Sequence, residues 1–251
     1  MAEVRPFQGI RYNIRKIHDL SGAICPPYDI ISPRQQDALY QSSEFNFVRI
    51  EYNRETSLDN DQDNRYTRAA DTIRKWLEQG ILEYDKIPAF YLHAHHFAWA
   101  GKNYIRRDII VRLRLEEWDK NIIRPHENII PRAKSDRMSM LRSCRCNTSQ
   151  VLAMYQDPEK IIRSILTEAE KQAPVFDFSD SLGDRHQLWP VSNPESVRQI
   201  QNVISPQPLY IADGHHRYDS ALTYRREMAS QLESVTGDEG FNFVMTSLID
   251  F

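Results

Sequence analysis

Hydrophobic and polar positions along the chain follow two different periods. Strict alternation with many β-forming residues predicts strands over residues 46–52, 88–99 and 104–115, and the last two are expected to form a hairpin. Apolar residues at spacings of three and four predict a helix over residues 60–79, which Gly80 ends. Ser32, Pro33 and Gln35 predict a further helix start, because they combine an N-cap, a first-turn proline and a capping box.

Predicted strands and helices also follow one another through the second half of the chain. Strands are predicted over residues 150–155, 175–178, 186–191, 208–212 and 241–251. Helices are predicted over residues 135–146, 158–172, 194–204 and 214–233. We therefore expect an α/β protein with a mixed (α+β) sheet, built as one domain or as two tightly packed lobes of about residues 1–130 and 131–251. Because the chain ends inside an apolar strand, we expect it to be truncated at its C-terminus.

Composition and charge argue against several classes of protein. The net charge of −3 lacks the basic excess of a general nucleic-acid binder, so we expect no nucleic-acid partner. No apolar run approaches the roughly 18 residues of a membrane helix, and the first residues lack the apolar core of a signal peptide. The chain is therefore expected to be cytoplasmic, without a membrane partner. Its cysteines, Cys25, Cys144 and Cys146, are too few for a secreted disulfide scaffold and are expected to be reduced thiols.

The most informative motif lies where the predicted strand at 208–212 enters the predicted helix at 214–233. Asp213 and Gly214 form the turn, and a helix that starts there leaves free backbone N–H groups that favour an anion. His215, His216 and Arg217 place positive charge in the first turn, against the helix dipole, and an anionic ligand would explain that arrangement. The motif predicts a phosphate-binding turn.

Two other interpretations of this motif stay open. Asp213 is a common type of N-cap residue, in which case the basic residues simply face solvent. His215 and His216 as metal ligands are less favoured, because adjacent helix positions do not converge on one ion.

Further candidate residues lie in loops framed by proline and on a predicted helix. Asp29 and Glu127 are carboxylates held in such loops, and either fits beside a phosphate site, although each also fits an ordinary surface ion pair or cap. Lys134 and Arg137 are three residues apart, so they share a helix face that suits a phosphate or an amino-acid carboxylate. A solvated helix edge explains the same pair equally well.

Three histidines, His93, His95 and His96, lie together in a predicted strand. His93 and His95 share one face while His96 points to the other. A catalytic zinc normally has three protein ligands, so two histidines among aromatic neighbours favour ordinary sheet packing.

Several separated motifs resemble a bacterial and archaeal family catalogued as a domain of unknown function. The segments that carry the resemblance are Val4-Arg-Pro-Phe7, Tyr12-Asn13, Pro26-Pro-Tyr-Asp-Ile-Ile-Ser-Pro33, His126-Glu127, Lys134, Asp136-Arg137, Leu141 and Ala212-Asp-Gly-His-His-Arg-Tyr218. They cover essentially the whole chain. Family members are usually longer than this chain, in line with a truncated sequence.

More distantly, the segment from Asp213 to Arg217 is similar to the nucleotide loops of the ParB/sulfiredoxin-like superfamily, which includes free-serine kinases. The resemblance implies a ParB/sulfiredoxin-like nucleotide-binding core with extra N-terminal strands and helices. It also implies ATP or ADP with Mg²⁺ as cofactors and phosphorylation of the hydroxyl of free L-serine or a similar metabolite. Sulfiredoxin has its catalytic cysteine where this chain has His215, which argues against a sulfinic-acid reductase.

We assign predicted roles on this basis. Asp213 is the candidate magnesium ligand and, with Glu127, a candidate catalytic carboxylate, because phosphoryl transfer needs charge neutralisation and an oriented acceptor. Nucleotide binding is assigned to Gly214, His215, His216 and Arg217. Binding of the small-molecule substrate is assigned to Tyr28, Asp29, His126, Lys134 and Arg137. The alternatives are a non-catalytic ParB-like nucleotide-binding regulatory module and a nucleotide or phosphoester hydrolase.

Overall fold

A computed structural model describes residues 1–126 and 131–251, and the side chains of residues 1–126 and 135–251. The chain builds a mixed nine-stranded sheet with the order β6-β10-β7-β11-β5-β4-β9-β8, and β1 pairs with β5 off this path. The strands are β1 (Val4–Arg5), β4 (Phe90–Trp99), β5 (Lys102–Arg114), β6 (Ile123–Arg124), β7 (Val151–Tyr155), β8 (Phe176–Ser179), β9 (Arg185–Val191), β10 (Leu209–Asp213) and β11 (Phe243–Asp250). Two pairs, β10 with β6 and β11 with β7, are parallel, and the other pairs are antiparallel. The expected α/β class with a mixed sheet is confirmed.

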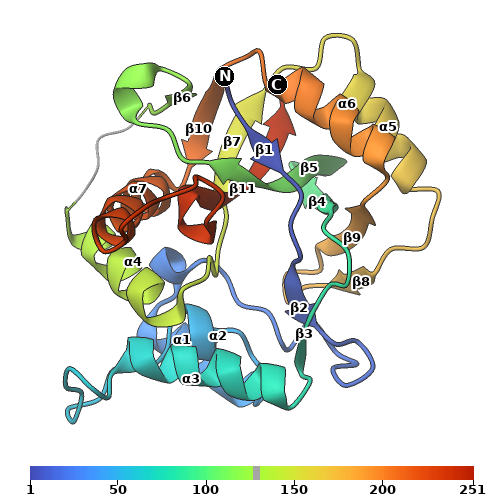
Figure 1. Ribbon diagram of the computed structural model, residues 1–251. Coiled ribbons are helices and arrows are strands. Elements are labelled where there is room, and N and C mark those ends of the chain that lie inside the picture. The colour runs from blue at the N-terminus through green and yellow to red at the C-terminus, as the bar shows by residue number, and fades with distance from the viewer. Residues whose placement is uncertain (127–130) are drawn as a thin grey trace.

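Helices surround this sheet in three groups (Figure 1). The neighbouring helices α5 (Ile161–Ala169) and α6 (Pro194–Ile204) form one group, and α4 (Pro131–Cys144) and α7 (His215–Ser230) form another. The third group is an N-terminal layer made of α1 (Pro33–Ser42), α2 (Val48–Glu51), α3 (Arg65–Glu78) and the small sheet of β2 (Ile10–Tyr12) and β3 (Leu82–Tyr84). Three short 3₁₀ turns are η1 (Tyr28–Ile30), η2 (Trp118–Lys120) and η3 (Gly240–Asn242). The large sheet takes strands from both sides of residue 130.

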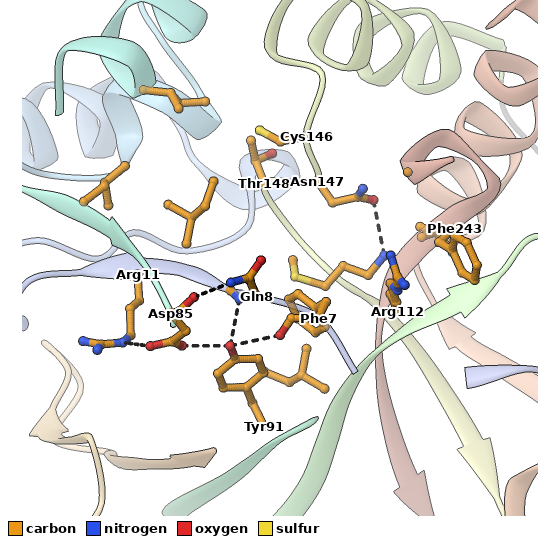
Figure 2. A pocket seen from close by; sticks show the side chains of 18 of the residues that line it. Phe7, Gln8, Arg11, Asp85, Tyr91, Arg112, Cys146, Asn147, Thr148 and Phe243 are labelled. Atoms are coloured by element: carbon orange, nitrogen blue, oxygen red, sulfur yellow. Dashed lines mark hydrogen bonds and ion pairs between the residues drawn. The ribbon is translucent and has the colours of Figure 1, made fainter. Parts of the chain in front are cut away.

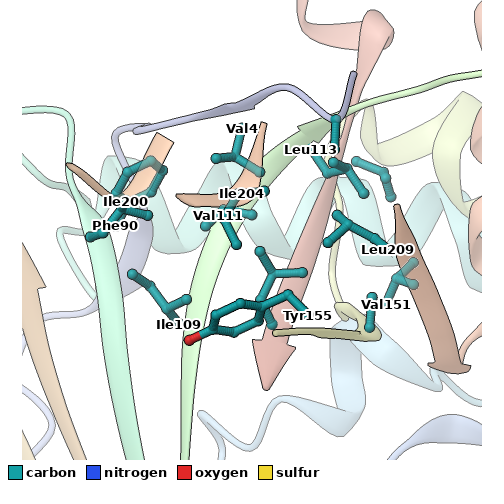
Figure 3. Packing of buried hydrophobic residues seen from close by; sticks show 14 of the residues in the cluster. Val4, Phe90, Ile109, Val111, Leu113, Val151, Tyr155, Ile200, Ile204 and Leu209 are labelled. Carbon is teal, nitrogen blue, oxygen red and sulfur yellow. The ribbon is translucent and has the colours of Figure 1, made fainter. Parts of the chain in front are cut away.

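The main hydrophobic core lies on one face of the large sheet. Phe90, Leu92 and Ala94 of β4 alternate into it, together with Ile200 and Ile204 of α6, and all five are at most 1% exposed. Figure 3 shows how the strand side chains interdigitate with those of the helix. Residues at the intervening positions of β4 point to the opposite face, so the two faces of this strand have different chemistry.

The N-terminal layer has its own hydrophobic cluster. Trp76 of α3 packs beside Tyr12 of β2, and their ring centroids are 6.0 Å apart. The hydroxyl of Tyr12 donates a hydrogen bond of 2.7 Å to the carbonyl of Phe45. This cluster anchors the layer that carries the loop with Tyr28.

Most predicted elements are confirmed, and local signals explain why. Helix α6 has the predicted bounds, because Asn193 caps it and Pro194 occupies its first turn. The capping box between Ser32 and Gln35 is present at the start of α1. The hairpin of β4 and β5 forms with direct pairing between Trp99 and Lys102. Within the described residues, no helix combines the length and apolar character required to cross a bilayer.

The predicted strand over residues 46–52 is wrong, because this segment contains the short helix α2. Asn46 is fully buried, and its side-chain oxygen accepts a hydrogen bond of 2.9 Å from the amide of Val48. Its side-chain nitrogen donates at 2.8 Å to the carbonyls of Gly22 and Ile24. This local bonding holds the helical turn, and it overrides the alternating β-forming residues.

We predict that Asn46→Ala destabilises the fold by about 3 kcal/mol, because it leaves buried backbone groups without partners. Urea unfolding monitored by circular dichroism measures the change. Asn202→Ala, on the exposed face of α6, is the control and should change stability by less than about 0.5 kcal/mol. Equal stability of the two variants would contradict this role of Asn46.

Candidate functional site

The candidate site is the turn between β10 and α7. Asp213 is the last residue of β10, and a bulge between Ile211 and Asp213 changes the register with β7. Gly214 is the N-cap of α7 with φ of +86°, and as a glycine it offers no side-chain cap to the helix. The N-cap position of this 16-residue helix is therefore filled by backbone alone, which is the kind of helix start at which anions bind.

Gly214 is required by both conformation and space. Its positive φ is a conformation that other residues adopt at a cost. A Cβ atom on this residue would lie 3.3 Å from the Cα of Val151 and 3.3 Å from Nη1 of Arg217. The turn thus packs directly on the backbone of β7.

Arg217 is held against this turn. Its side chain is 13% exposed, and Nη1 donates a hydrogen bond of 2.6 Å to the carbonyl of Gln150. The same nitrogen lies 3.5 Å from the carboxylate of Asp213, whose side chain is 64% exposed. Within the described part of the chain, the buried Nε of Arg217 has no hydrogen-bond partner. The result is a fixed guanidinium beside an accessible carboxylate.

The segment containing His126 meets the turn through parallel pairing of β6 with β10. Nδ1 of His126 donates a 2.6 Å hydrogen bond to the carbonyl of Ile211, and its backbone amide donates at 3.2 Å to Nε2 of His215. The two rings meet edge to face with centroids 4.6 Å apart. His215 is 3% exposed, and its Nε2 accepts a hydrogen bond, so this nitrogen carries no proton. His215 therefore fixes the position of His126.

Tyr28 and Arg137 form a second part of the site. The guanidinium carbon of Arg137 lies 3.6 Å from the centroid of the Tyr28 ring, which is a close cation–π contact. Arg137 is 5% exposed, and it pairs with Glu51 at 3.0 Å and with Asp136 at 2.6 Å. These two carboxylates neutralise the charge of Arg137, so this residue is suited to holding the Tyr28 ring in position.

The electrostatic surroundings of Tyr28 connect it to the turn. Burial raises the pKa of Tyr28, while the positive charges of Arg137 and Arg217 act in the opposite direction. The nearby carboxylate of Asp29 also raises this pKa, and Asp29 itself is exposed. The Tyr28 ring thus lies within electrostatic reach of Arg217.

His216, Glu127 and Lys134 are the remaining residues of the predicted site. His216 is half-buried in the first turn of α7. Glu127 lies outside the described residues, and so does the side chain of Lys134, whose backbone belongs to α4. The structure therefore brings together His126, Asp213, Gly214, His215 and Arg217, with Tyr28 and Arg137 nearby.

A chain of hydrogen bonds that the sequence did not predict lies on the face of β4 opposite the main core. Ser247 of β11 donates to Asp108 of β5, and Asp108 lies 2.9 Å from Nδ1 of His93. Nε2 of His93 lies 3.0 Å from Nδ1 of His186, and the two rings are nearly parallel with centroids 5.3 Å apart. Nε2 of His186 then approaches Asp180 at 3.4 Å. Strand register alone creates this chain, and no local motif signals it.

His93 and His95 do share one face, and their rings are stacked with centroids 6.3 Å apart. His95 pairs with Asp184 at 2.9 Å, whereas His96 bonds Gln187. A search of the described residues finds no group of three or more histidine, cysteine or acidic side chains able to hold a metal ion.

The three cysteines are free thiols in half-buried positions. Burial, together with the negative charge of Glu51, raises the pKa of Cys25 to about 12 and that of Cys146 to about 11. Thiols of this kind stay protonated at neutral pH and react slowly.

A family model described as proteins of unknown function (DUF1015) matches residues 4–251. The chain belongs to this family. No curated protein and no solved structure matches the chain. Membership therefore confirms the resemblance carried by the separated motifs, while the ParB/sulfiredoxin-like core stays a prediction.

We predict that Gly214→Ala destabilises this family member by more than the roughly 1–2 kcal/mol of a left-handed backbone conformation, because the new methyl group also meets β7. Gly101→Ala is a matched control, since Gly101 has φ of +74° and open space around it. Thermal and urea unfolding of both variants separate backbone strain from crowding. A smaller loss in Gly214→Ala than in Gly101→Ala would argue against the tight turn.

We also predict that His186 makes the fold less stable in acid. Burial and the neighbouring His93 and His95 lower the pKa of His186. The unfolded chain therefore takes up a proton at a higher pH than the folded chain, and stability falls as pH drops through about 6.5. Urea unfolding at pH 7.5 and 5.5 should show a smaller difference for His186→Gln than for wild type. His18→Gln, at an exposed position, should keep the wild-type difference.

Proposed function

We propose that this protein is a cytoplasmic, nucleotide-dependent kinase that phosphorylates the hydroxyl of a small metabolite, free L-serine or a similar compound. The observation that carries the proposal is the start of α7 at Gly214, which has no capping side chain of its own, with Arg217 fixed beside the exposed carboxylate of Asp213. Phosphoryl transfer depends mainly on charge neutralisation and alignment, and these groups supply both.

The nucleotide phosphates would bind at the first turn of α7. Backbone amides after Gly214 and the helix dipole favour an anion there. Arg217 adds a guanidinium whose orientation is set by the carbonyl of Gln150. Its buried Nε, which has no partner among the described residues, gives a further donor for a phosphate oxygen. His216 lies in the same turn and is assigned to the phosphates as well.

Asp213 fits a magnesium ion. Magnesium prefers one or two carboxylates together with phosphate oxygens, and Asp213 is an exposed carboxylate at the end of a rigid strand. Its contact with Arg217, at 3.5 Å, is long for a charge-assisted hydrogen bond, so the carboxylate is available. When bound, the ion would neutralise the charge of the transferring phosphoryl group.

The acceptor would bind on the side of Tyr28. The raised pKa of this hydroxyl keeps it protonated, so it can donate a hydrogen bond to the acceptor, while the exposed carboxylate of Asp29 suits an ammonium group. Arg137 would act by holding the Tyr28 ring. Lys134, three residues before Arg137 on α4, is assigned to the acceptor from its position in the sequence.

A catalytic base completes the proposal. Glu127 follows His126 directly in the sequence, and the ring of His126 is anchored to the carbonyl of Ile211 near the turn. Glu127 is therefore the candidate for accepting the hydroxyl proton, with Asp213 as the other carboxylate.

Purified protein incubated with ADP or ATP, magnesium and free serine should yield O-phosphoserine, detected by mass spectrometry. Arg217→Ala should weaken nucleotide affinity by about tenfold or more, because charge-assisted hydrogen bonds are lost. Asp213→Asn should lower kcat by about a hundredfold with a smaller effect on affinity. Isothermal titration and initial-rate kinetics measure the two effects separately.

Arg198→Ala is a control on the exposed surface of α6 and should match wild type in both assays. Release of phosphate without an acceptor would instead identify a hydrolase. Nucleotide binding without turnover on a panel of hydroxylated metabolites would identify a regulatory module. Wild-type behaviour of both site variants would reject the site itself.

A further inference from the structure

A cavity of about 420 Å³ lies between the N-terminal layer and the large sheet (Figure 2). This volume falls within the range of small-molecule sites, which is roughly 300–1,000 Å³. Most of its wall is apolar, with Phe7, Phe47, Ile50, Leu188 and Phe243 among the lining residues. None of the proposed phosphoryl-transfer residues whose side chains the structure describes lines it, so the cavity is a separate feature of the fold.

Arg112 brings to this wall a positive charge that forms no ion pair with the described residues. It lines the cavity from β5, and its buried Nε has no hydrogen-bond partner among the described residues. Burial lowers the pKa of Arg112, and the nearby charges of Arg5 and Arg114 act in the same direction, while the carboxylates of Asp238 and Glu3 act in the opposite direction. A guanidinium in such surroundings is stabilised by any anion that approaches it.

The neighbouring Arg114 differs from Arg112, because its guanidinium has ion-pair and hydrogen-bond partners. Arg112 and Arg114 both lie over the Phe243 ring, at 4.6 and 4.7 Å from its centroid. Arg114 pairs with Glu3 at 2.5 Å and donates to the carbonyl of Gly237 at 2.7 Å. Across residues 1–126 and 131–251, no carboxylate lies within ion-pair distance of Arg112. Arg114 is therefore a natural comparison on the same strand and the same ring.

The acidic group of the cavity is already neutralised. Asp85 pairs with Arg11 at 2.7 Å and accepts a 2.8 Å hydrogen bond from the hydroxyl of Tyr91. Arg145 also lines the cavity and adds a second positive charge, from a left-handed backbone position with φ of 53°. The cavity thus combines apolar walls with an excess of positive charge.

We propose that this cavity is a second ligand site, which binds a small carboxylic acid with an apolar body. The carboxylate pairs with Arg112, and the hydrocarbon part fills the space between Phe7, Ile50 and Leu188. A cavity of this size, at the lower end of the range for small-molecule sites, suits an acid with about ten non-hydrogen atoms. This inference is independent of the proposed kinase activity.

Octanoate is the probe, and octan-1-ol is the same chain without the charge. Isothermal titration at pH 7.5 should show octanoate binding at one site, at least tenfold more tightly than octan-1-ol. Arg112→Gln should weaken octanoate binding by tenfold or more and leave octan-1-ol binding within threefold of wild type. The matched variant Arg114→Gln should bind octanoate within threefold of wild type.

Thr148→Trp provides a steric test, because Thr148 lines the cavity from the segment before β7. It should abolish binding of both probes, with circular dichroism confirming the fold. Absence of octanoate binding to wild type would overturn the proposal. Equal binding of acid and alcohol, or octanoate binding to Arg112→Gln at wild-type affinity, would overturn it as well.

Discussion

A buried guanidinium fixes how the N-terminal layer meets the rest of the molecule. Arg137 of α4 pairs with Glu51 of α2 and with Asp136, and Asp136 also accepts hydrogen bonds from Arg65 and Tyr66 of α3. Removing one partner from a buried ion pair typically costs about 3–5 kcal/mol, because the other charge is left uncompensated. The mutual arrangement of α2, α3 and α4 is therefore constrained by electrostatics as well as by apolar packing.

This ion-pair cluster also connects separated parts of the sequence. The ring of Tyr28 covers Arg137, so the proline-rich loop is held by the same charges that join the helices. Arg217 contributes to the electrostatic surroundings of that ring from the start of α7. Three family motifs, far apart along the chain, therefore meet around two arginines.

The sequence contained enough information for the framework of the fold. Caps, prolines and long alternating segments located the β4–β5 hairpin and α6, because these signals act within a few residues. Strands of two residues, such as β1 and β6, have too few positions to show a period. The helical turn after Asn46 depends on carbonyls more than twenty residues earlier in the chain, which a local pattern does not contain.

The candidate site likewise combines features that the local sequence predicts with features that depend on residues far along the chain. The β10–α7 turn follows from local sequence, whereas the packing of Gly214 on Val151 and the placement of His126 depend on the pairing of β10 with β7 and with β6. The internal ion pairs of Arg137 were equally hidden, because its partner Glu51 lies in the segment predicted as a strand. Likewise, His186 joins His93 only through the register of β4 with β9.

The central position of β11 has a consequence for how the chain folds during synthesis. Residues 243–250 lie between β7 and β5, so they alone join the β6-β10-β7 group to the group that contains the hairpin. Until these residues leave the ribosome, the sheet exists as two parts with facing, unpaired edges. Such edges favour pairing with other chains, so the nascent protein is protected against aggregation once β11 inserts between them.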